Sequence, residues 1–269
     1  MPSKGAFIAA CAAVTALTIC PPASAAPVSL PPTTGGFDYQ LGGPSDIPGL
    51  AVVARDSTDA PLAGAYNICY LNGFQTQPGS GQAWLTHHGD AILRDAGGGE
   101  VIDPDWPDEY VLDPSTGPQR AAILEVLAPS VNRCADNGFD ALEIDNLDTF
   151  TRYPGIDRAG ALELARDFVA LAHGRGLAIG QKNAAEITGT GHDEIGFDFA
   201  IAEECAAYDE CSAYTGVYGS HVLQIEYSDN LPSPFAGVCS ATDRAPLTIL
   251  RDRDLTPAGA PGHTYQQCR

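Results

Sequence analysis

The chain has 269 residues, 44% of them hydrophobic, and its 34 acidic side chains outnumber its 14 basic ones, so its formal net charge is -20. This charge excludes nucleic acid as a favourable partner, because phosphate backbones are bound mainly through Lys and Arg. A cationic polymer would be attracted to such a field, although on charge alone an acidic surface is explained more simply by solubility.

The first residues predict export. One lysine in residues 1–4 precedes an apolar, helix-prone run over residues 5–20, and small residues at 23–26 suit a signal peptidase. We expect residues 1–26 to be a cleaved signal peptide, and the mature protein to be secreted. A retained anchor is disfavoured, because the run is shorter than the roughly 20 apolar residues that a bilayer needs. No membrane association is expected after cleavage.

Residues 27–36 are predicted to be a flexible leader, since this segment is rich in proline. From residue 37 to residue 269, short apolar runs alternate with helical or loop segments. Two helices are clear, at residues 118–137 and 157–175, and Gly138 and Gly176 end them. The glycine- and proline-rich region 76–113 is expected to form one wall of a cleft. Eight runs are candidate strands, over residues 37–41, 50–54, 66–72, 141–146, 177–183, 197–203, 222–227 and 246–251.

Several of these strands are nearly continuous apolar runs that become polar only at their C-terminal ends. Strands buried on both faces of a parallel sheet have this pattern. Together with the repeated alternation of strand and helix, it predicts an α/β fold, a (β/α)₈ TIM barrel in a single domain over residues 37–269, with a C-terminal tail over residues 252–269. We expect a monomer.

Six cysteines remain once the signal peptide is removed, and in an oxidising compartment they are expected to form disulfides. Closeness in sequence favours Cys205 with Cys211. A bond between Cys239 and Cys268 would hold the C-terminal tail, which leaves Cys69 and Cys134 as a third pair. No cysteine or histidine spacing suggests zinc. We therefore expect neither a metal nor another cofactor.

Polar and charged residues gather where five of the predicted strands end. In barrels of this kind the working residues lie at the C-terminal strand ends. If Asp145 points into the barrel mouth, strand alternation places Glu143 one layer deeper on the same side and Ile144 towards the helices. The strand-end groups are Tyr70 to Asn72, Glu143 to Asp148, Gln181 to Asn183, Glu203 with Glu204, and Glu226 with Tyr227.

Asp145 and Glu203 fit the needs of acetal cleavage, which uses one carboxylate at the anomeric carbon and one carboxylic acid on the leaving oxygen. Lys182, the only lysine of the mature chain, should lower the pKa of Asp145 and so favour its role as nucleophile. Glu203 follows an apolar run and precedes Glu204, so desolvation and like charge should raise its pKa and favour general acid and base catalysis.

Several segments resemble glycoside hydrolase family 114, the endo-α-1,4-polygalactosaminidases. The most specific are GFDALEIDNLD at 138–148 and FDFAIAEECAAYDEC at 197–211, and the resemblance runs in order from residue 37 to residue 229. It implies a (β/α)₈ barrel that hydrolyses α-1,4-linked galactosamine, a cationic polysaccharide, with retention of configuration. It also implies that Asp145 and Glu203 are the catalytic carboxylates. The motif does not decide which of them is the nucleophile.

Other strand-end residues are expected to contact the substrate by hydrogen bonds, ion pairs or stacking. Three alternatives remain: a carbohydrate-binding barrel without turnover, a hydrolase of another amino-sugar polymer, and a hydrolase whose acidic cluster holds calcium or magnesium. The expected substrate-binding residues are Asp38, Tyr70, Asn146, Asp148, Lys182, Asn183, Glu226, Tyr227 and Trp106.

Overall fold

The computed structural model describes residues 28–269 together with Met1. The expected signal peptide lies outside the described residues, except for Met1. Within the described part of the chain, no helix has both the length and the apolar character required to cross a membrane.

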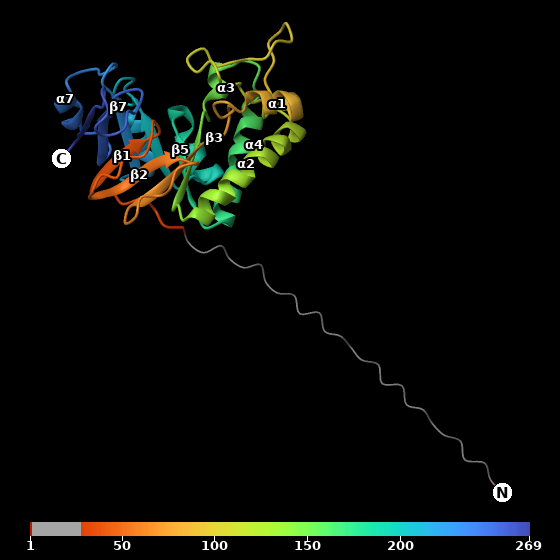
Figure 1. The fold of residues 1–269 in the computed structure, drawn as a ribbon, viewed down its shortest axis with the longest axis horizontal. Helices are drawn as coiled ribbons and strands as arrows, with labels where there is room; N and C mark the ends of the chain where they lie inside the picture. Colours follow the sequence, from red (N-terminus) through yellow and green to blue (C-terminus); the bar gives the residue numbers. More distant parts are fainter. Residues whose placement is uncertain (2–27) are drawn as a thin grey trace.

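Eight parallel strands form the sheet, each hydrogen-bonded to the next in chain order (Figure 1). All eight expected strands are present, with bounds that differ by only a few residues from the predicted ones. They are β1 (Gly36–Gln40), β2 (Leu50–Asp56), β3 (Tyr66–Asn72), β4 (Ala141–Asp145), β5 (Ala178–Lys182), β6 (Phe199–Glu203), β7 (Val222–Tyr227) and β8 (Leu247–Arg251).

A ninth strand, β9 (Tyr265–Gln267), pairs antiparallel with β8 and was not predicted from the sequence. Its side chains reach across to β1. The Tyr265 hydroxyl donates to the carbonyl of Phe37 at 2.8 Å, and the Phe37 amide donates to Gln267 Oε1 at 3.2 Å. The barrel is therefore nearly closed, and β9 bridges the seam between its first and last parallel strands.

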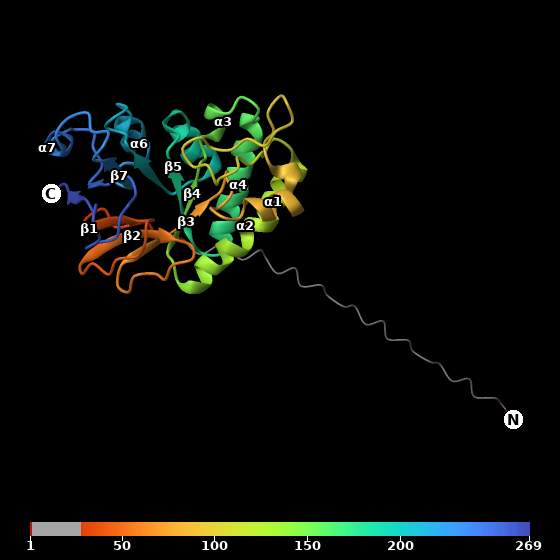
Figure 2. The same ribbon diagram turned by 45° about the horizontal axis from the view of Figure 1, so that its top comes forward.

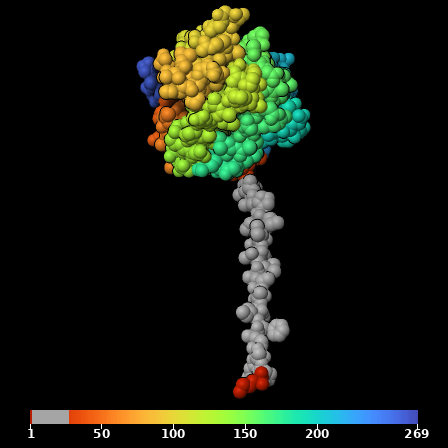
Figure 3. Space-filling model, turned by 90° about the vertical axis from the view of Figure 1, so that its right-hand side faces the viewer, coloured from red at the N-terminus to blue at the C-terminus, as the bar shows by residue number. Residues whose placement is uncertain are grey.

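The two predicted helices, α2 (Gly117–Asn137) and α4 (Arg158–Gly174), lie side by side over the outer face of β3 to β5 (Figures 1 and 2). Thr116 begins α2 with a capping box, and Gly138 ends it with φ of 87°, a conformation that favours glycine. Asp157 caps α4 by accepting a hydrogen bond from the Gly160 amide at 2.7 Å. Figure 3 shows the face that these helices and the long loop before them cover.

The remaining helices are short, and no helix lies between β1 and β2 or between β2 and β3. The structure is thus a TIM-type barrel whose two long helices lie on the same side (Figure 2). The short helices are α1 (Gly81–His87), η1 (Gly89–Ala91), α3 (Thr149–Arg152), η2 (Ala185–Ile187), α5 (Thr188–Thr190), η3 (Gly191–Ile195), α6 (Cys211–Tyr218) and α7 (Phe235–Cys239).

Alternation along the strands separates two hydrophobic clusters. Ile68, Ile201 and Ile225 belong to the cluster inside the barrel, whereas Leu142 and Ile144 belong to the cluster that includes the buried residues of α2 and α4. On β4 this leaves Glu143 and Asp145 on the inner side, as expected from the period of two.

The three expected disulfides are present. They join β3 to α2, close the loop between β6 and α6, and tie α7 to the end of the chain after β9. The pairs are Cys69–Cys134, Cys205–Cys211 and Cys239–Cys268.

Candidate active site

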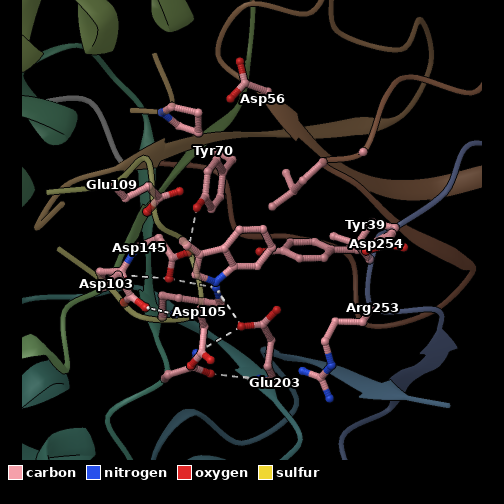
Figure 4. A pocket seen from close by; sticks show the side chains of 18 of the residues that line it. Tyr39, Asp56, Tyr70, Asp103, Asp105, Glu109, Asp145, Glu203, Arg253 and Asp254 are labelled. Atoms are coloured by element: carbon pink, nitrogen blue, oxygen red, sulfur yellow. Dashed lines mark hydrogen bonds and ion pairs between the residues drawn. The ribbon is translucent and has the colours of Figure 1, made fainter. Parts of the chain in front are cut away.

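A pocket of about 490 Å³ lies at the C-terminal end of the barrel strands. Strand ends form its floor, and the long loop between β3 and α2 forms one wall, as expected. Figure 4 shows acidic side chains gathered around it. Of the expected catalytic and substrate-binding residues, nine line the pocket: Tyr70, Trp106, Asp145, Asn146, Asp148, Lys182, Asn183, Glu203 and Tyr227.

The ammonium group of Lys182 lies at the centre of the pocket floor. Its Nζ lies 2.9 Å from Asp145 Oδ1 and 3.0 Å from Glu203 Oε2. The Lys182 side chain is 1% exposed, and those of Asp145 and Glu203 are 18% and 22% exposed. One buried ammonium therefore holds two carboxylates, from β4 and β6, that are open to the pocket.

Each of the two carboxylates also accepts a hydrogen bond from a tyrosine. The Tyr70 hydroxyl donates to Asp145 Oδ2 at 2.7 Å, and the Tyr227 hydroxyl donates to Glu203 Oε1. Asn183 and Glu203 are joined twice, since Asn183 Nδ2 donates to Glu203 Oε2 at 3.2 Å and the Glu203 amide donates to Asn183 Oδ1 at 2.9 Å. Both carboxylates are thus oriented by neighbouring strands.

Backbone turns at two strand ends let adjacent residues line the same pocket. Asn146 and Asn183 follow β4 and β5 with φ of 65° and 50°, in the left-handed region where asparagine is enriched. Because the chain leaves the extended conformation there, Asn146 lines the pocket beside Asp145, and Asn183 lines it beside Lys182.

The charges around Lys182 set the pKa of Asp145. Burial of this carboxyl raises its pKa, but the Lys182 ammonium and the hydrogen bonds from Tyr70, Lys182 and the Asn146 amide outweigh burial and bring the pKa below 3.8. Asp145 is therefore ionised at neutral pH, as its expected role as nucleophile requires.

The family to which the chain belongs follows from its sequence. The sequence matches the model of glycoside hydrolase family GH114 over residues 18–269. The chain belongs to this family. It is a glycoside hydrolase.

Solved structures share the fold at low sequence identity. Ega3 from Aspergillus fumigatus, solved in complex with galactosamine, is 18% identical with a TM-score of 0.69, and the match covers 90% of this chain and 99% of Ega3. The glycoside hydrolase domain of PelA from Pseudomonas aeruginosa is 14% identical with a TM-score of 0.57, over 82% of this chain and 95% of that domain. No curated protein matches the sequence significantly.

Two residues expected in the site lie elsewhere. Asp38 is 1% exposed and forms an ion pair with Arg251 at 2.6 Å across the barrel seam. Glu226 is fully buried and accepts hydrogen bonds from the Ala206 amide and from Gln224. Both expectations were wrong for the same reason: their strand neighbours point inward, so alternation turns these two side chains away from the barrel interior.

Glu204 was expected to place a second negative charge beside Glu203. Instead, its carboxylate pairs with Arg253 at 2.7 Å and accepts a hydrogen bond from Asn230 at 3.0 Å. The Arg253 guanidinium also lies over the ring of Tyr227, 4.6 Å from its centroid. Through Arg253, Glu204 thus helps to hold Tyr227 in place at one side of the pocket.

Sequence reasoning missed a network around Arg152. Its guanidinium donates to Asp103 at 2.9 Å, to Asp148 at 3.2 Å and to Asn146 Oδ1 at 2.6 Å. Arg152 thereby links the long loop to the turn after β4. Only the position of Asp103 in the expected cleft wall could have suggested it.

The long loop also supplies Glu109, which was not predicted. Its side chain lines the pocket and accepts a hydrogen bond from Asn72 Nδ2 at 2.6 Å. Burial raises the pKa of Glu109 to about 7. Other pocket residues that the sequence did not single out are Tyr39, Asp56, Gln77, Asp105 and Asp254.

The acidic cluster that we considered for calcium or magnesium contains Lys182 at its centre, so an ammonium already occupies the position between Asp145 and Glu203 that a shared cation would take. Among the described residues, one group of potential ligands is compact enough to hold a metal ion: Cys205, Cys211 and Glu226. Its two sulfur atoms are joined in a disulfide, which removes the thiolates that a metal would need. Neither cluster favours a metal.

Proposed function

We propose that this glycoside hydrolase cleaves α-1,4-linked galactosamine polymers with retention of configuration. Asp145 is the nucleophile, and Glu203 is the general acid and base. The observation that carries the proposal is the pair of carboxylates from β4 and β6 that share the buried ammonium of Lys182.

The separation of the two carboxylates supports retention. Asp145 Oδ1 and Glu203 Oε2 lie 2.9 Å and 3.0 Å from the same nitrogen atom, so they are no more than 5.9 Å apart. Retaining glycosidases place their carboxyl groups about 5 to 5.5 Å apart, whereas inverting enzymes need roughly 6.5 to 9.5 Å to admit a water molecule. This upper limit is closer to the retaining range than to the inverting range, which supports retention.

In the first step, Asp145 attacks the anomeric carbon while Glu203 gives its proton to the leaving glycosidic oxygen. A covalent glycosyl-enzyme forms and the shortened chain departs. In the second step, Glu203 takes a proton from water, whose oxygen attacks the anomeric carbon and releases Asp145. Lys182 and Tyr70 hold Asp145 ionised for the attack, and Tyr227 orients Glu203.

The charge of the pocket supports a cationic substrate. Nine carboxylate side chains and three cationic ones line it, and each of the cations, Arg152, Lys182 and Arg253, is already paired with an acidic side chain. A cleft of one sign raises the local concentration of an oppositely charged ligand. The structural likeness to Ega3 in complex with galactosamine points the same way.

We further propose that the protein acts outside the cell. The sequence of residues 1–26 is typical of a signal peptide. The three disulfides of the described chain are also of the kind that persists in oxidising compartments.

Product analysis on galactosamine oligomers tests the proposal. The wild-type protein should shorten deacetylated oligomers, and NMR of fresh products should show the α-anomer first. Asp145→Asn should lower the rate by more than about a thousandfold, and Glu203→Gln by about a hundredfold to ten-thousandfold. Asp167→Asn and Glu125→Gln, which change exposed carboxylates on α4 and α2, should retain the wild-type rate.

Several results would overturn parts of this proposal. Release of the β-anomer first would reject retention. Binding of oligomers without any product would favour a carbohydrate-binding barrel. Faster cleavage of glucosamine than galactosamine oligomers would assign another amino-sugar polymer.

A further inference from the structure

Glu143 is a buried carboxyl group directly below the catalytic pair, and the mechanism above does not use it. It lies on β4 two residues before Asp145, and its side chain is fully buried. Glu143 Oε1 accepts a hydrogen bond from the Tyr39 hydroxyl at 2.5 Å. Glu143 Oε2 is buried and has no hydrogen-bond partner among the residues that the structure describes. An ionised carboxylate with an unpartnered oxygen is costly in such a place.

Glu143 also competes for the ammonium of Lys182. Its Oε1 lies 3.5 Å from Lys182 Nζ, which is already 2.9 Å from Asp145 and 3.0 Å from Glu203. If all three carboxylates were ionised, one positive charge would face three negative charges inside the barrel. Burial makes such an excess unfavourable, because the charges are poorly screened by water.

Resting on the function proposed above, we propose that Glu143 is a positioning residue that keeps its proton during turnover. Loss of this proton draws Lys182 down, away from Asp145 and Glu203, and slows the reaction. Glu143 would thereby make the activity of the site sensitive to pH without touching the substrate.

The surroundings of Glu143 place the loss of its proton near neutral pH. Burial raises the pKa of Glu143 to about 7, although Lys182 and the hydrogen bond from Tyr39 act in the opposite direction. Gly180 lies opposite Glu143 on β5 and carries no side chain. The titratable groups that face Glu143 come from five strands: Tyr39 on β1, Tyr70 on β3, Asp145 on β4, Lys182 on β5 and Glu203 on β6.

The test is the pH dependence of kcat on one oligomeric substrate for Glu143→Gln and the wild-type protein. The glutamine has nearly the same shape but cannot ionise, so Lys182 should stay with the catalytic pair at higher pH. One pH unit above the wild-type alkaline midpoint, the wild-type rate should have fallen roughly tenfold, and the variant should have lost much less. The amines of the substrate titrate over the same pH range in both assays, so they do not contribute to the difference between the two proteins.

Glu226→Gln is the matched control. Glu226 is another fully buried glutamate with an unpartnered Oε2 in the described chain. It lies on β7, however, and its side chain points away from Lys182. Its replacement makes the same chemical change outside the site, so the alkaline midpoint should not move.

Tyr39→Phe provides a second variant if Glu143→Gln does not fold. The Tyr39 hydroxyl donates to Glu143 Oε1 and lowers the pKa of Glu143. Without this donor, Glu143 should keep its proton longer, and the alkaline midpoint should rise by about one pH unit.

Infrared difference spectroscopy at pH 6 distinguishes a failure of this proposal from a failure of the proposed function. The difference between the wild-type and Glu143→Gln spectra should contain a buried carboxylic-acid band, whatever substrate is cleaved. Glu109, which also keeps its proton at pH 6, contributes equally to both spectra. An unchanged alkaline midpoint in Glu143→Gln would overturn the proposal. So would a folded Glu143→Gln protein that is inactive at every pH, or the absence of this band.

Discussion

The guanidinium of Arg253 lies 4.6 Å from the ring centroid of Tyr227, and the hydroxyl of Tyr227 donates a hydrogen bond to Glu203. Arg253 is in turn held by Glu204 and by Asp229. The tyrosine that orients the proposed acid and base is therefore fixed by an ion-pair network on the outer rim of the pocket. The contribution of the Tyr227 hydroxyl to catalysis can therefore be tested without removing the ion pairs that hold the ring.

Tyr227→Phe removes this hydroxyl and leaves the ring under Arg253. A hydrogen bond to a charged group contributes about 1.5 to 3 kcal/mol. Without it, Glu203 should be held less firmly in its reactive position, and kcat should fall roughly tenfold or more. Tyr218→Phe is the control, since the Tyr218 hydroxyl donates to Gln181 Oε1 at 2.7 Å away from the pocket. It should alter stability and not kcat, and equal kcat losses in both variants would contradict this role of Tyr227.

Lys182→Met removes the cation that holds Asp145 ionised. The pKa of Asp145 should rise, so this proposed nucleophile would be ionised only at higher pH, and the acidic limb of kcat/KM should move up by about one pH unit or more. The measurement is kcat/KM between pH 3 and pH 7. Arg166→Met, which removes a pair with Glu163 on the surface of α4, should leave the limb in place. The interpretation fails if both variants keep the wild-type limb.

Arg251→Met should destabilise the barrel at its seam. The side chains of Arg251 and Asp38 are each 1% exposed, and removing one partner of a buried ion pair costs about 3 to 5 kcal/mol. For a chain of this size the thermal midpoint should fall on the order of 10 °C. Arg175→Met breaks an exposed pair with Asp136 and should cost no more than about 1 kcal/mol. Similar shifts in the two variants would show that the seam does not depend on Arg251.

Glu109→Gln should change how stability depends on pH. Burial raises the pKa of Glu109 from 4.5 to about 7, so the folded protein retains a proton that the unfolded chain has lost. The stabilising contribution of this proton is complete below pH 4.5 and disappears as the pH rises through 7. Urea unfolding of Glu109→Gln should therefore give a free energy that falls less over this interval than in the wild-type protein. Identical slopes would contradict the burial of this carboxyl, and exposed Glu125→Gln serves as the control.

Adjacent residues at strand ends show where sequence reasoning failed. We expected both Glu226 and Tyr227 in the pocket, yet strand alternation allows only one of them, and Tyr227 is the one inside. For Asp145 and Asn146 the same expectation succeeded, because the positive φ of Asn146 ends the extended conformation. Applying alternation strictly within each strand would have excluded Asp38 and Glu226 beforehand.

The sequence by itself determined the eight parallel strands, the two long helices, the pairing of nearby cysteines and the gathering of polar groups at strand ends. These features depend on local periodicity, on capping residues and on short separations along the chain. Only the tertiary structure decided that Lys182 lies between Asp145 and Glu203, that Arg152 joins the long loop to β4, and that β9 bridges the seam. Such contacts join residues far apart in sequence, and they follow from how the strands twist and close around one another.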